Sequence, residues 1–364
     1  MSQLASILRT TLAAYKEAAL CRLVGRWRPK PPAAPSYNYS SETFTVERFG
    51  DCQKGSYIEV YRPDTPWRDA QGRMRAVIFL HGFVLGASQI YRAHLEHLVK
   101  QGTTVFFPNF QTGFCSFPDT GLMTLAELLD EVIGEGRPSQ EKWLQNALES
   151  VAGAYERCGF GPGTEVDTYV YGHSLGGLFA LSWPYYVQAG GYPAQLMPLQ
   201  VVTADPIPSG TTTAKAQAPM QLGAALARTQ SDVDLQVTGA ALTMPVAILH
   251  GADDWIVPKE HWQAPFGWIA TPHKKMFLSQ SDTHGCPGLF ANHEQATDDT
   301  SFFRPWLATL LLDGVGSVDT LDYAYLWRGL DQVVAQGVRA DQLAFEMGQW
   351  SDGHAVAPIV PYLP

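Results

Sequence analysis

Short apolar runs alternate with amphipathic stretches along the middle of the chain. The run Ala76–Leu80 is apolar throughout, as is typical of strands buried on both faces of a parallel sheet. The stretch Ser139–Arg157 has apolar residues at helical spacing and a capping serine at its start. We predict strands at Phe44–Phe49, Tyr57–Tyr61, Ala76–Leu80, Thr103–Phe107, Thr168–Tyr171, Leu199–Ala204, Pro245–His250 and Lys275–Leu278, and helices at Ser88–Lys100, Ser139–Arg157, Leu175–Tyr186 and Phe302–Leu312. This alternation predicts an α/β fold with a mostly parallel central sheet and helices on both faces.

The chain divides into three predicted parts. Residues 1–35 are predicted as a basic amphipathic helix followed by a proline-rich linker, and residues 36–314 as the main α/β domain. Within that domain, residues 111–138 and 209–244 are long connections, which makes them candidates for a lid. Residues 315–364 are predicted as a helical extension that packs on the domain.

The N-terminal part differs from the rest in charge. Residues 1–30 carry six basic side chains and one acidic one, so their net charge is +5, whereas the whole chain carries −10 and the remaining 334 residues therefore −15. Arg9, Lys16 and Glu17 interrupt the apolar positions, so the segment is not a clear secretory signal. Three interpretations remain open: a helix packed on the domain, an interfacial helix in peripheral contact with anionic lipid, or an unusual targeting segment.

Composition excludes several classes of protein. Hydrophobic residues make up 46% of the chain and charged residues 16%, which argues against a disordered chain. The negative net charge argues against a nucleic-acid partner, and no run of eighteen apolar residues predicts a membrane-spanning helix. The five cysteines are scattered without a Cys-x-x-Cys pair, so we expect no structural zinc. This pattern favours a reducing, cytoplasmic compartment, although one or two disulfides remain compatible with it.

The strongest chemical signal is the motif Gly172–Gly177, with the sequence GHSLGG. It follows a predicted strand and opens a predicted helix. A very sharp strand-to-helix turn needs small residues at Gly172 and Gly176, and it lifts the hydroxyl of Ser174 above the edge of the sheet. The start of the following helix also favours developing negative charge. The motif therefore predicts that Ser174 is a nucleophile rather than only a helix cap.

With this motif, residues 40–312 resemble the α/β-hydrolase family. The resemblance rests on Gly172–Gly177, on His81-Gly82-Phe83 after the strand Ala76–Leu80, and on the segment Gly251–Pro258. It implies that these strand ends surround one active site. It also implies that His81-Gly82-Phe83 is an oxyanion-hole turn, in which the amides of Phe83 and Leu175 would hold the oxyanion.

The acid of the implied triad has three candidates. The sequence Asp253-Asp254-Trp255-Ile256-Val257-Pro258 resembles the family pattern of an aspartate before an apolar pair and a proline, and its register favours Asp254. Asp253, the residue before it, is the second candidate. Asp205 ends the preceding strand, where some lipases of this fold place their acid.

The base is predicted as His284, in the segment Ser281–Gly285 after the last predicted strand. The resulting order of serine, aspartate and histidine is the one that this family uses. Three other histidines are set aside: His273 precedes that strand, His293 is interpreted as one element too late, and His173 is expected to pack beside the serine.

The resemblance implies a serine carboxylic ester hydrolase (EC 3.1.1) that forms an acyl-enzyme and needs no cofactor or metal. Aromatic residues near the motifs, namely Phe83, Trp183 and Trp255, are candidates for binding apolar or aromatic groups of a small or polymeric ester. Four alternatives stay open: a lipase, a polyester hydrolase, an acyltransferase, and a catalytically silent binding scaffold.

Overall fold

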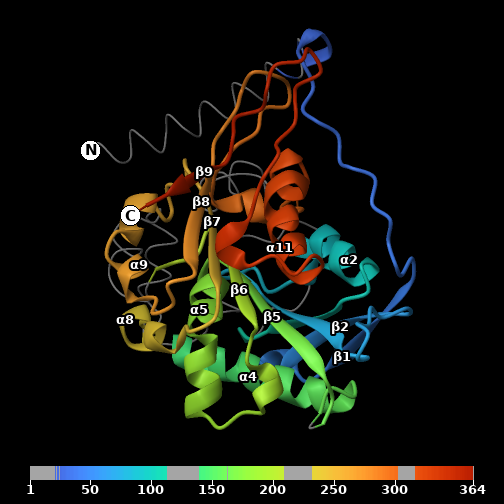
Figure 1. Cartoon of the computed structure of the whole chain (residues 1–364), viewed down its shortest axis with the longest axis vertical. Helices are drawn as coiled ribbons and strands as arrows, with labels where there is room; N and C mark the ends of the chain where they lie inside the picture. Colours follow the sequence, from blue (N-terminus) through green and yellow to red (C-terminus); the bar gives the residue numbers. More distant parts are fainter. Residues whose placement is uncertain are drawn as a thin grey trace.

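The computed structural model describes residues 21, 23, 25–112, 139–161, 163–208, 232–301 and 316–363. Their centre is a nine-stranded sheet with the order β1-β2-β4-β3-β5-β6-β7-β8-β9 (Figure 1). Strands β3 to β8 run parallel to one another, whereas β1, β2 and β9 pair antiparallel to their neighbours. The carboxyl ends of the parallel strands therefore share one edge, where loops bring distant residues together.

The strand positions agree closely with the apolar runs of the sequence. The strands are β1 Phe44–Phe49, β2 Tyr57–Pro63, β3 Met74–Leu80, β4 Thr104–Asn109, β5 Val166–His173, β6 Gln200–Ala204, β7 Val246–Gly251, β8 Lys274–Ser279 and β9 Val360–Tyr362. In β3, the five residues Ala76–Leu80 are fully buried. Because such strands are buried on both faces, their sequences are continuous apolar runs. Eight of the nine strands confirm the predicted ones.

Helices cover both faces of the sheet. The helices are α2 Arg92–Lys100, α4 Gln140–Arg157, α5 Leu175–Ala189, α8 Leu235–Thr238, α9 Pro265–Trp268 and α11 Trp327–Val334, the last continuing the π-turn Asp322–Leu326. Successive strand residues point to opposite faces. Accordingly, Phe106 of β4 packs on Tyr155 of α4, and Phe107 packs on Tyr91 beside α2. The predicted fold class is thereby confirmed.

Two features at the C-terminal end were not predicted. Strand β9 pairs with β8 at the edge of the sheet. In the π-turn, the hydroxyl of Tyr325 donates to Phe277 O of β8 at 2.7 Å and accepts from His250 N of β7 at the same distance. The C-terminal residues thus hold the ends of the neighbouring strands β7 and β8. The predicted lid segments lie mostly outside the described residues, as does the predicted helix Phe302–Leu312.

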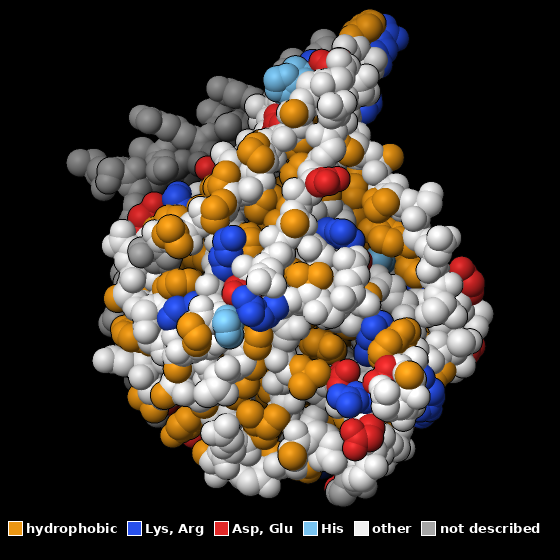
Figure 2. Space-filling view, viewed as in Figure 1, with side chains coloured by type: hydrophobic (Ala, Val, Ile, Leu, Met, Phe, Trp, Pro, Cys, Tyr) orange, Lys and Arg blue, Asp and Glu red, His pale blue; other side chains and the backbone are white. Residues whose placement is uncertain are grey.

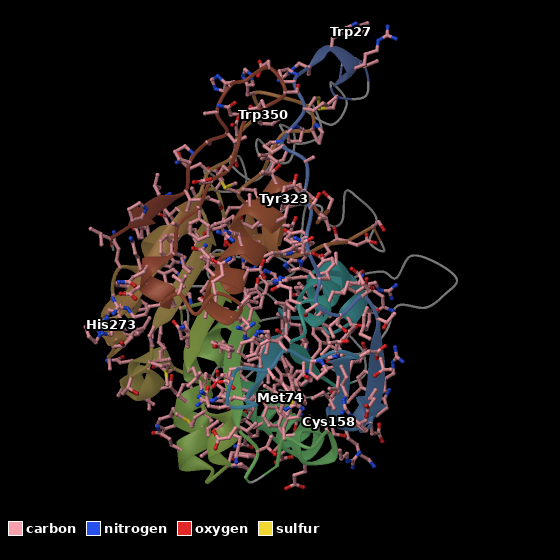
Figure 3. The ribbon with its side chains drawn as sticks, turned by 45° about the vertical axis from the view of Figure 1, so that its right-hand side comes forward. Trp27, Met74, Cys158, His273, Tyr323 and Trp350 are labelled. Carbon is pink, nitrogen blue, oxygen red and sulfur yellow. A yellow bond between two sulfur atoms is a disulfide. The ribbon has the colours of Figure 1, made fainter. Side chains whose placement is uncertain are left out.

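A narrow arm projects beyond the sheet. It consists of residues 25–32, 281–288 and 347–357, which lie side by side at the top of Figure 1. Backbone hydrogen bonds link the three segments: Cys286 N donates to Pro29 O at 2.8 Å, and Ser351 N donates to Lys30 O at 2.9 Å. Trp350 lies within the arm and Trp27 at its far end (Figure 3). Because residues 281–288 follow the carboxyl end of β8, the arm is an excursion from the edge of the sheet where the parallel strands end.

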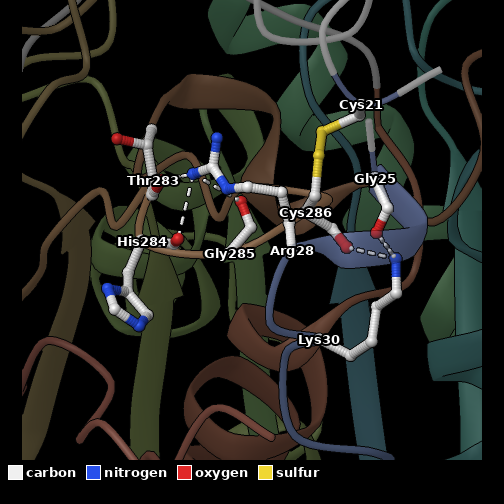
Figure 4. The surroundings of a disulfide bond; sticks show 8 residues. All are labelled: Cys21, Gly25, Arg28, Lys30, Thr283, His284, Gly285 and Cys286. Atoms are coloured by element: carbon white, nitrogen blue, oxygen red, sulfur yellow. Dashed lines mark hydrogen bonds between the residues drawn. A yellow bond between two sulfur atoms is a disulfide. The ribbon is translucent and has the colours of Figure 1, made fainter. Parts of the chain in front are cut away.

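Two of the described cysteines pair across the arm. A disulfide joins Cys21 to Cys286, which are 265 residues apart (Figure 4). Cys52 is also disulfide-bonded, and Cys158 is a buried free thiol. These pairings go against the reducing compartment that the cysteine pattern favours and agree with the alternative of one or two disulfides. Scattered spacing carried no information on pairing, because the arm brings together residues from the two ends of the chain.

Candidate active site

The turn after β5 has the sharp geometry that the glycine pattern indicates. Ser174 has φ 55° and ψ −116°, an uncommon conformation for a residue with a side chain. A Cβ on Gly172 would lie 2.1 Å from Gly176 O, and one on Gly176 would lie 2.2 Å from Leu80 O. Only glycine permits this crowding, which holds Ser174 between the end of β5 and the first turn of α5.

A histidine lies directly against this serine, and it is His293. Its Nε2 is 2.8 Å from Ser174 Oγ, and its Nδ1 is 2.8 Å from Asp254 Oδ2. All three residues are buried: Ser174 is 8% exposed, Asp254 4% and His293 3%. The three side chains thus form a continuous chain of hydrogen bonds from β5 through the turn after β8 to the turn after β7.

The prediction that His284 is the base is wrong. His284 lies in the arm, where its Nε2 is 2.8 Å from Asp352 Oδ2 and its ring stacks on His354. The chain leaves the sheet at Ser281 and returns at Leu289, where Asp282 and Leu289 form a bridge. The first histidine after β8 is therefore carried away on the arm. The second lies where the chain comes back to the sheet.

A local signal for His293 exists in the sequence. Asn292 caps the short 3₁₀ turn His293–Ala296, and its side chain accepts a hydrogen bond from Glu294 N at 3.2 Å. This turn starts a new element immediately after the excursion, which fixes the position of His293. Counting elements along the sequence places His293 too late, because the excursion between Ser281 and Leu289 adds residues to the chain away from the sheet.

The structure separates the three candidate acids. Asp254 lies against His293, and its Oδ1 also accepts from Val257 N at 2.8 Å, within the turn that the motif describes. Asp253 is exposed. Asp205 is fully buried, and it accepts from Gly251 N at 2.7 Å and from Gln295 Nε2 at 3.0 Å. The structure thus places Asp254 against the histidine that contacts Ser174.

Two opposing effects act on the histidine. Burial lowers the pKa of His293, but the negative charges of Asp254 and Asp205 and the hydrogen bond to Asp254 outweigh it and raise this pKa to about 9. Burial raises the pKa of the Asp205 carboxyl well above its usual range, as does the charge of Asp254. The site therefore strongly favours the imidazolium form of His293, which is the form that the base takes when it accepts a proton.

Asp205 links several elements next to Ser174, His293 and Asp254 through hydrogen bonds. Through Gln295 it connects to the turn that carries His293, and Gln295 Oε1 accepts from Ser279 Oγ at 2.7 Å at the end of β8. Asp205, His250 and Asp254 form the one group of potential metal ligands found among the described residues. Asp205 and Asp254 already accept the hydrogen bonds named above. We therefore interpret this group as part of the hydrogen-bond network that positions the site and not as a metal site.

His173 joins the serine turn to the other two loops. Its Nδ1 lies 2.9 Å from the hydroxyl of Tyr91, which itself accepts from Gly82 N at 3.0 Å. Its Nε2 lies 3.0 Å from the backbone oxygen of His293, so Nε2 must carry the donated hydrogen. Burial holds the pKa of His173 well below its usual value. His173 therefore packs beside the serine as a neutral, structural histidine.

The turn after β3 has a second uncommon backbone conformation. Val84 has φ 59°, and its N–H donates to Gln111 Oε1 at 2.8 Å. Among the described non-glycine residues, positive φ occurs at Val84, Ser174 and Asp205, all of them at this edge of the sheet. Leu175 is the first residue of α5, where a helix has no acceptor of its own for the N–H. The roles of the Phe83 and Leu175 amides as oxyanion donors stay predictions.

The three aromatic candidates differ in position. Trp183 is fully buried on α5, and its indole N–H donates to Leu196 O at 2.9 Å, so it packs in the core and the prediction of a binding role is wrong for it. Phe83 is 6% exposed and lies beside Trp143. Trp255 is partly buried, next to Asp254. Phe83 and Trp255 stay candidates for substrate contact.

Comparisons with known proteins find matches among solved structures alone. No family model matches the chain, and no curated protein matches it. Solved structures do match. Carboxyl esterase 2 from Tuber melanosporum is 13% identical, with 76% of this chain and 85% of that chain covered and a TM-score of 0.47.

Two further matches have similar values. Esterase B from Lactobacillus rhamnosis is 15% identical, with 77% and 85% of the two chains covered and a TM-score of 0.44. The acylaminoacyl peptidase of Pyrococcus horikoshii is 12% identical, with 66% of this chain and 37% of that chain covered and a TM-score of 0.45. These identities and TM-scores are too low to carry an argument about reaction or substrate. The strand order and the serine turn themselves give the chain the α/β-hydrolase architecture.

Proposed function

We propose that the protein is a serine hydrolase that cleaves carboxylic esters through Ser174, His293 and Asp254. The observation that carries this proposal is the buried chain of two 2.8 Å contacts from Ser174 Oγ to His293 and from His293 to Asp254. A histidine hydrogen-bonded to a serine on one side and to a carboxylate on the other is the arrangement that activates a hydroxyl nucleophile.

The reaction follows in two steps. His293 Nε2 accepts the proton of Ser174 as Oγ attacks the ester carbonyl, and Asp254 stabilises the imidazolium that forms. The same proton then passes to the departing alcohol, which leaves an acyl group on Ser174. A water molecule, deprotonated by His293, attacks this acyl group and releases the acid and the free serine. The amides of Phe83 and Leu175 are the proposed donors to the oxyanion in both steps.

The first test is hydrolysis of p-nitrophenyl esters from acetate to palmitate. We expect wild-type activity, and loss of about 10⁴- to 10⁶-fold in kcat for Ser174→Ala. Ser182→Ala is the matched control, because Ser182 lies on the same helix, fully buried, with its hydroxyl bonded to Thr238. Equal activity of Ser174→Ala and wild type would refute the proposal. A chain-length optimum would distinguish a short-chain esterase from a lipase, and acyl transfer to an added alcohol that outruns hydrolysis would identify an acyltransferase.

No helix among the described residues is long and apolar enough to cross a membrane. For the compartment, we propose an oxidising one instead of the cytoplasm, because Cys21 and Cys286 are paired and Cys52 is also disulfide-bonded. Thiol alkylation of the protein in intact cells, before lysis, tests this. Modification of Cys21 and Cys286 under those conditions would contradict it.

A further inference from the structure

The far end of the arm exposes large apolar side chains. Leu23 is 76% exposed and Trp27 is 68% exposed. Among the described residues, Trp27 is the one aromatic side chain in the set of exposed large hydrophobics, and Leu23 is its near neighbour in that set. Figure 3 shows Trp27 at the extremity of the molecule, and Figure 2 shows hydrophobic and basic side chains gathered there. We call Leu23, Arg26 and Trp27 the tip.

The tip is positively charged. The guanidinium of Arg26 lies 3.8 Å from the centre of the Trp27 ring, and neither Arg26 nor Lys30 forms an ion pair within the described part of the chain. Of the arm's carboxylates, Asp352 is paired with His284, and Asp282 accepts from His284 N and from the indole N–H of Trp350. The arm's negative charges are thus engaged below the tip, and its end combines apolar and cationic groups.

The tip is held in place rather than hanging from a loose terminus. The disulfide Cys21–Cys286 fixes one side of it (Figure 4). Below it, Arg28 donates to Thr283 O at 2.7 Å and to His284 O at 2.9 Å, and Lys30 donates to Cys286 O at 3.1 Å. These bonds fix the backbone beneath the tip, where Leu23 and Trp27 stay exposed to water.

We propose that the tip docks onto the surface of an anionic lipid bilayer, with Leu23 and Trp27 in the boundary between headgroups and acyl chains. Tryptophan and leucine beside arginine are the residue types that favour this boundary. The charge distribution supports the same partner: the arm carries Arg26, Arg28 and Lys30 against Asp282 and Asp352, a net charge of +1, whereas the whole chain carries −10, so an anionic surface favours the arm over the body. The molecule is thereby oriented with its arm toward the bilayer.

This orientation has a consequence for the site. The arm segment 281–288 leads through Asn292 directly into His293, so docking turns the carboxyl edge of the sheet toward the membrane. Binding itself does not depend on the proposed reaction. The test therefore uses binding as its readout, and Ser174→Ala is included to keep the two proposals separate.

The experiment is co-sedimentation of the full-length protein with phosphatidylcholine vesicles, with and without phosphatidylglycerol. We expect binding to the anionic vesicles and little to the neutral ones. Leu23→Ser with Trp27→Ser should weaken binding at least about tenfold, because two large apolar side chains lose their burial. Arg26→Glu should weaken it by about fivefold or more and reduce its salt dependence.

Val237→Ser and Leu363→Ser are the matched controls, because Val237 is 58% and Leu363 86% exposed away from the tip. Both should bind like wild type, as should Ser174→Ala. Equal binding of the tip variants and wild type would overturn the proposal, as would equal binding to neutral vesicles. A change in oligomeric mass of the tip variants without a change in vesicle binding would assign the tip to self-association instead.

Discussion

Two histidines nine residues apart form the same kind of pair in opposite surroundings. His284 and His293 each place a ring nitrogen 2.8 Å from an aspartate oxygen. At His284 the side chains are open to water, with 32% of the histidine and 44% of Asp352 exposed. At His293 only 4% of the histidine side chain and 0% of the Asp254 side chain are exposed, and the other ring nitrogen faces Ser174.

The comparison shows that a histidine–aspartate pair is not in itself a catalytic device. In water, a pair of this kind is screened and contributes little. In the buried turn, the same contact acts at low dielectric, so Asp254 shifts the proton affinity of His293 strongly. Burial and the adjacent serine distinguish the second pair from the first, and four predictions test that distinction.

The largest expected difference lies between the two histidines themselves. His293→Ala should lower kcat for ester hydrolysis by about 10⁴- to 10⁶-fold, because Ser174 loses its base. His284→Ala should leave kcat within about twofold, since the contacts that it removes, with Asp352 and His354, lie in the arm away from Ser174. Steady-state kinetics on p-nitrophenyl butyrate compares them, and a large loss in His284→Ala would mean that the arm folds back over the serine.

The next difference is between neighbouring aspartates. Asp254→Asn should lower kcat by about 10⁴-fold, because an amide favours the wrong tautomer of His293. Asp253→Asn, one residue earlier and exposed, should have nearly wild-type kcat. Circular dichroism controls for folding of both variants. If the two variants were equally active, the role of Asp254 would be limited to accepting the hydrogen bond from Val257 N within its turn.

The third prediction concerns pH. A general base must be neutral, so activity rises as His293 loses its proton. With the pKa of His293 raised to about 9, kcat/KM of the free enzyme should climb through neutral pH toward that value. The profile of kcat/KM, corrected with Ser174→Ala for spontaneous hydrolysis, checks this, and a plateau already at pH 7 would contradict it.

The sequence predicted the sheet better than the site. Eight strands followed from apolar runs such as Ala76–Leu80, because a strand buried on both faces leaves a local signature. The positions of Ser174 and Asp254 followed from short motifs at strand ends. His293 could not be found in this way, since its position depends on the path of a long excursion. That path is held by Cys21–Cys286 and by bonds from Arg28, which join residues more than 250 positions apart. Strand β9 was missed because it has three residues and forms only through pairing with β8.

The smallest expected effect concerns the support behind the buried pair. Gln295 donates to both oxygens of Asp205 at 3.0 Å and lies two residues after His293. Gln295→Met keeps the side chain's length but removes these bonds, so the turn that carries His293 loses its anchor to β6. We expect a decrease of about tenfold in kcat with little change in KM, because a small displacement of a base slows proton transfer more than binding.

Gln332→Met is the control for that variant. Gln332 is a comparably buried glutamine, 4% exposed, that donates to Ala344 O at 2.9 Å and accepts from Ala344 N at 3.0 Å, far from the triad in the chain. Both substitutions remove buried hydrogen bonds and should lower Tm by a similar few degrees. Only Gln295→Met should also lower kcat. If both variants lost stability and neither lost kcat, Asp205 and Gln295 would stabilise the fold without positioning His293, and the difference between the two histidines would rest on Asp254 and burial alone.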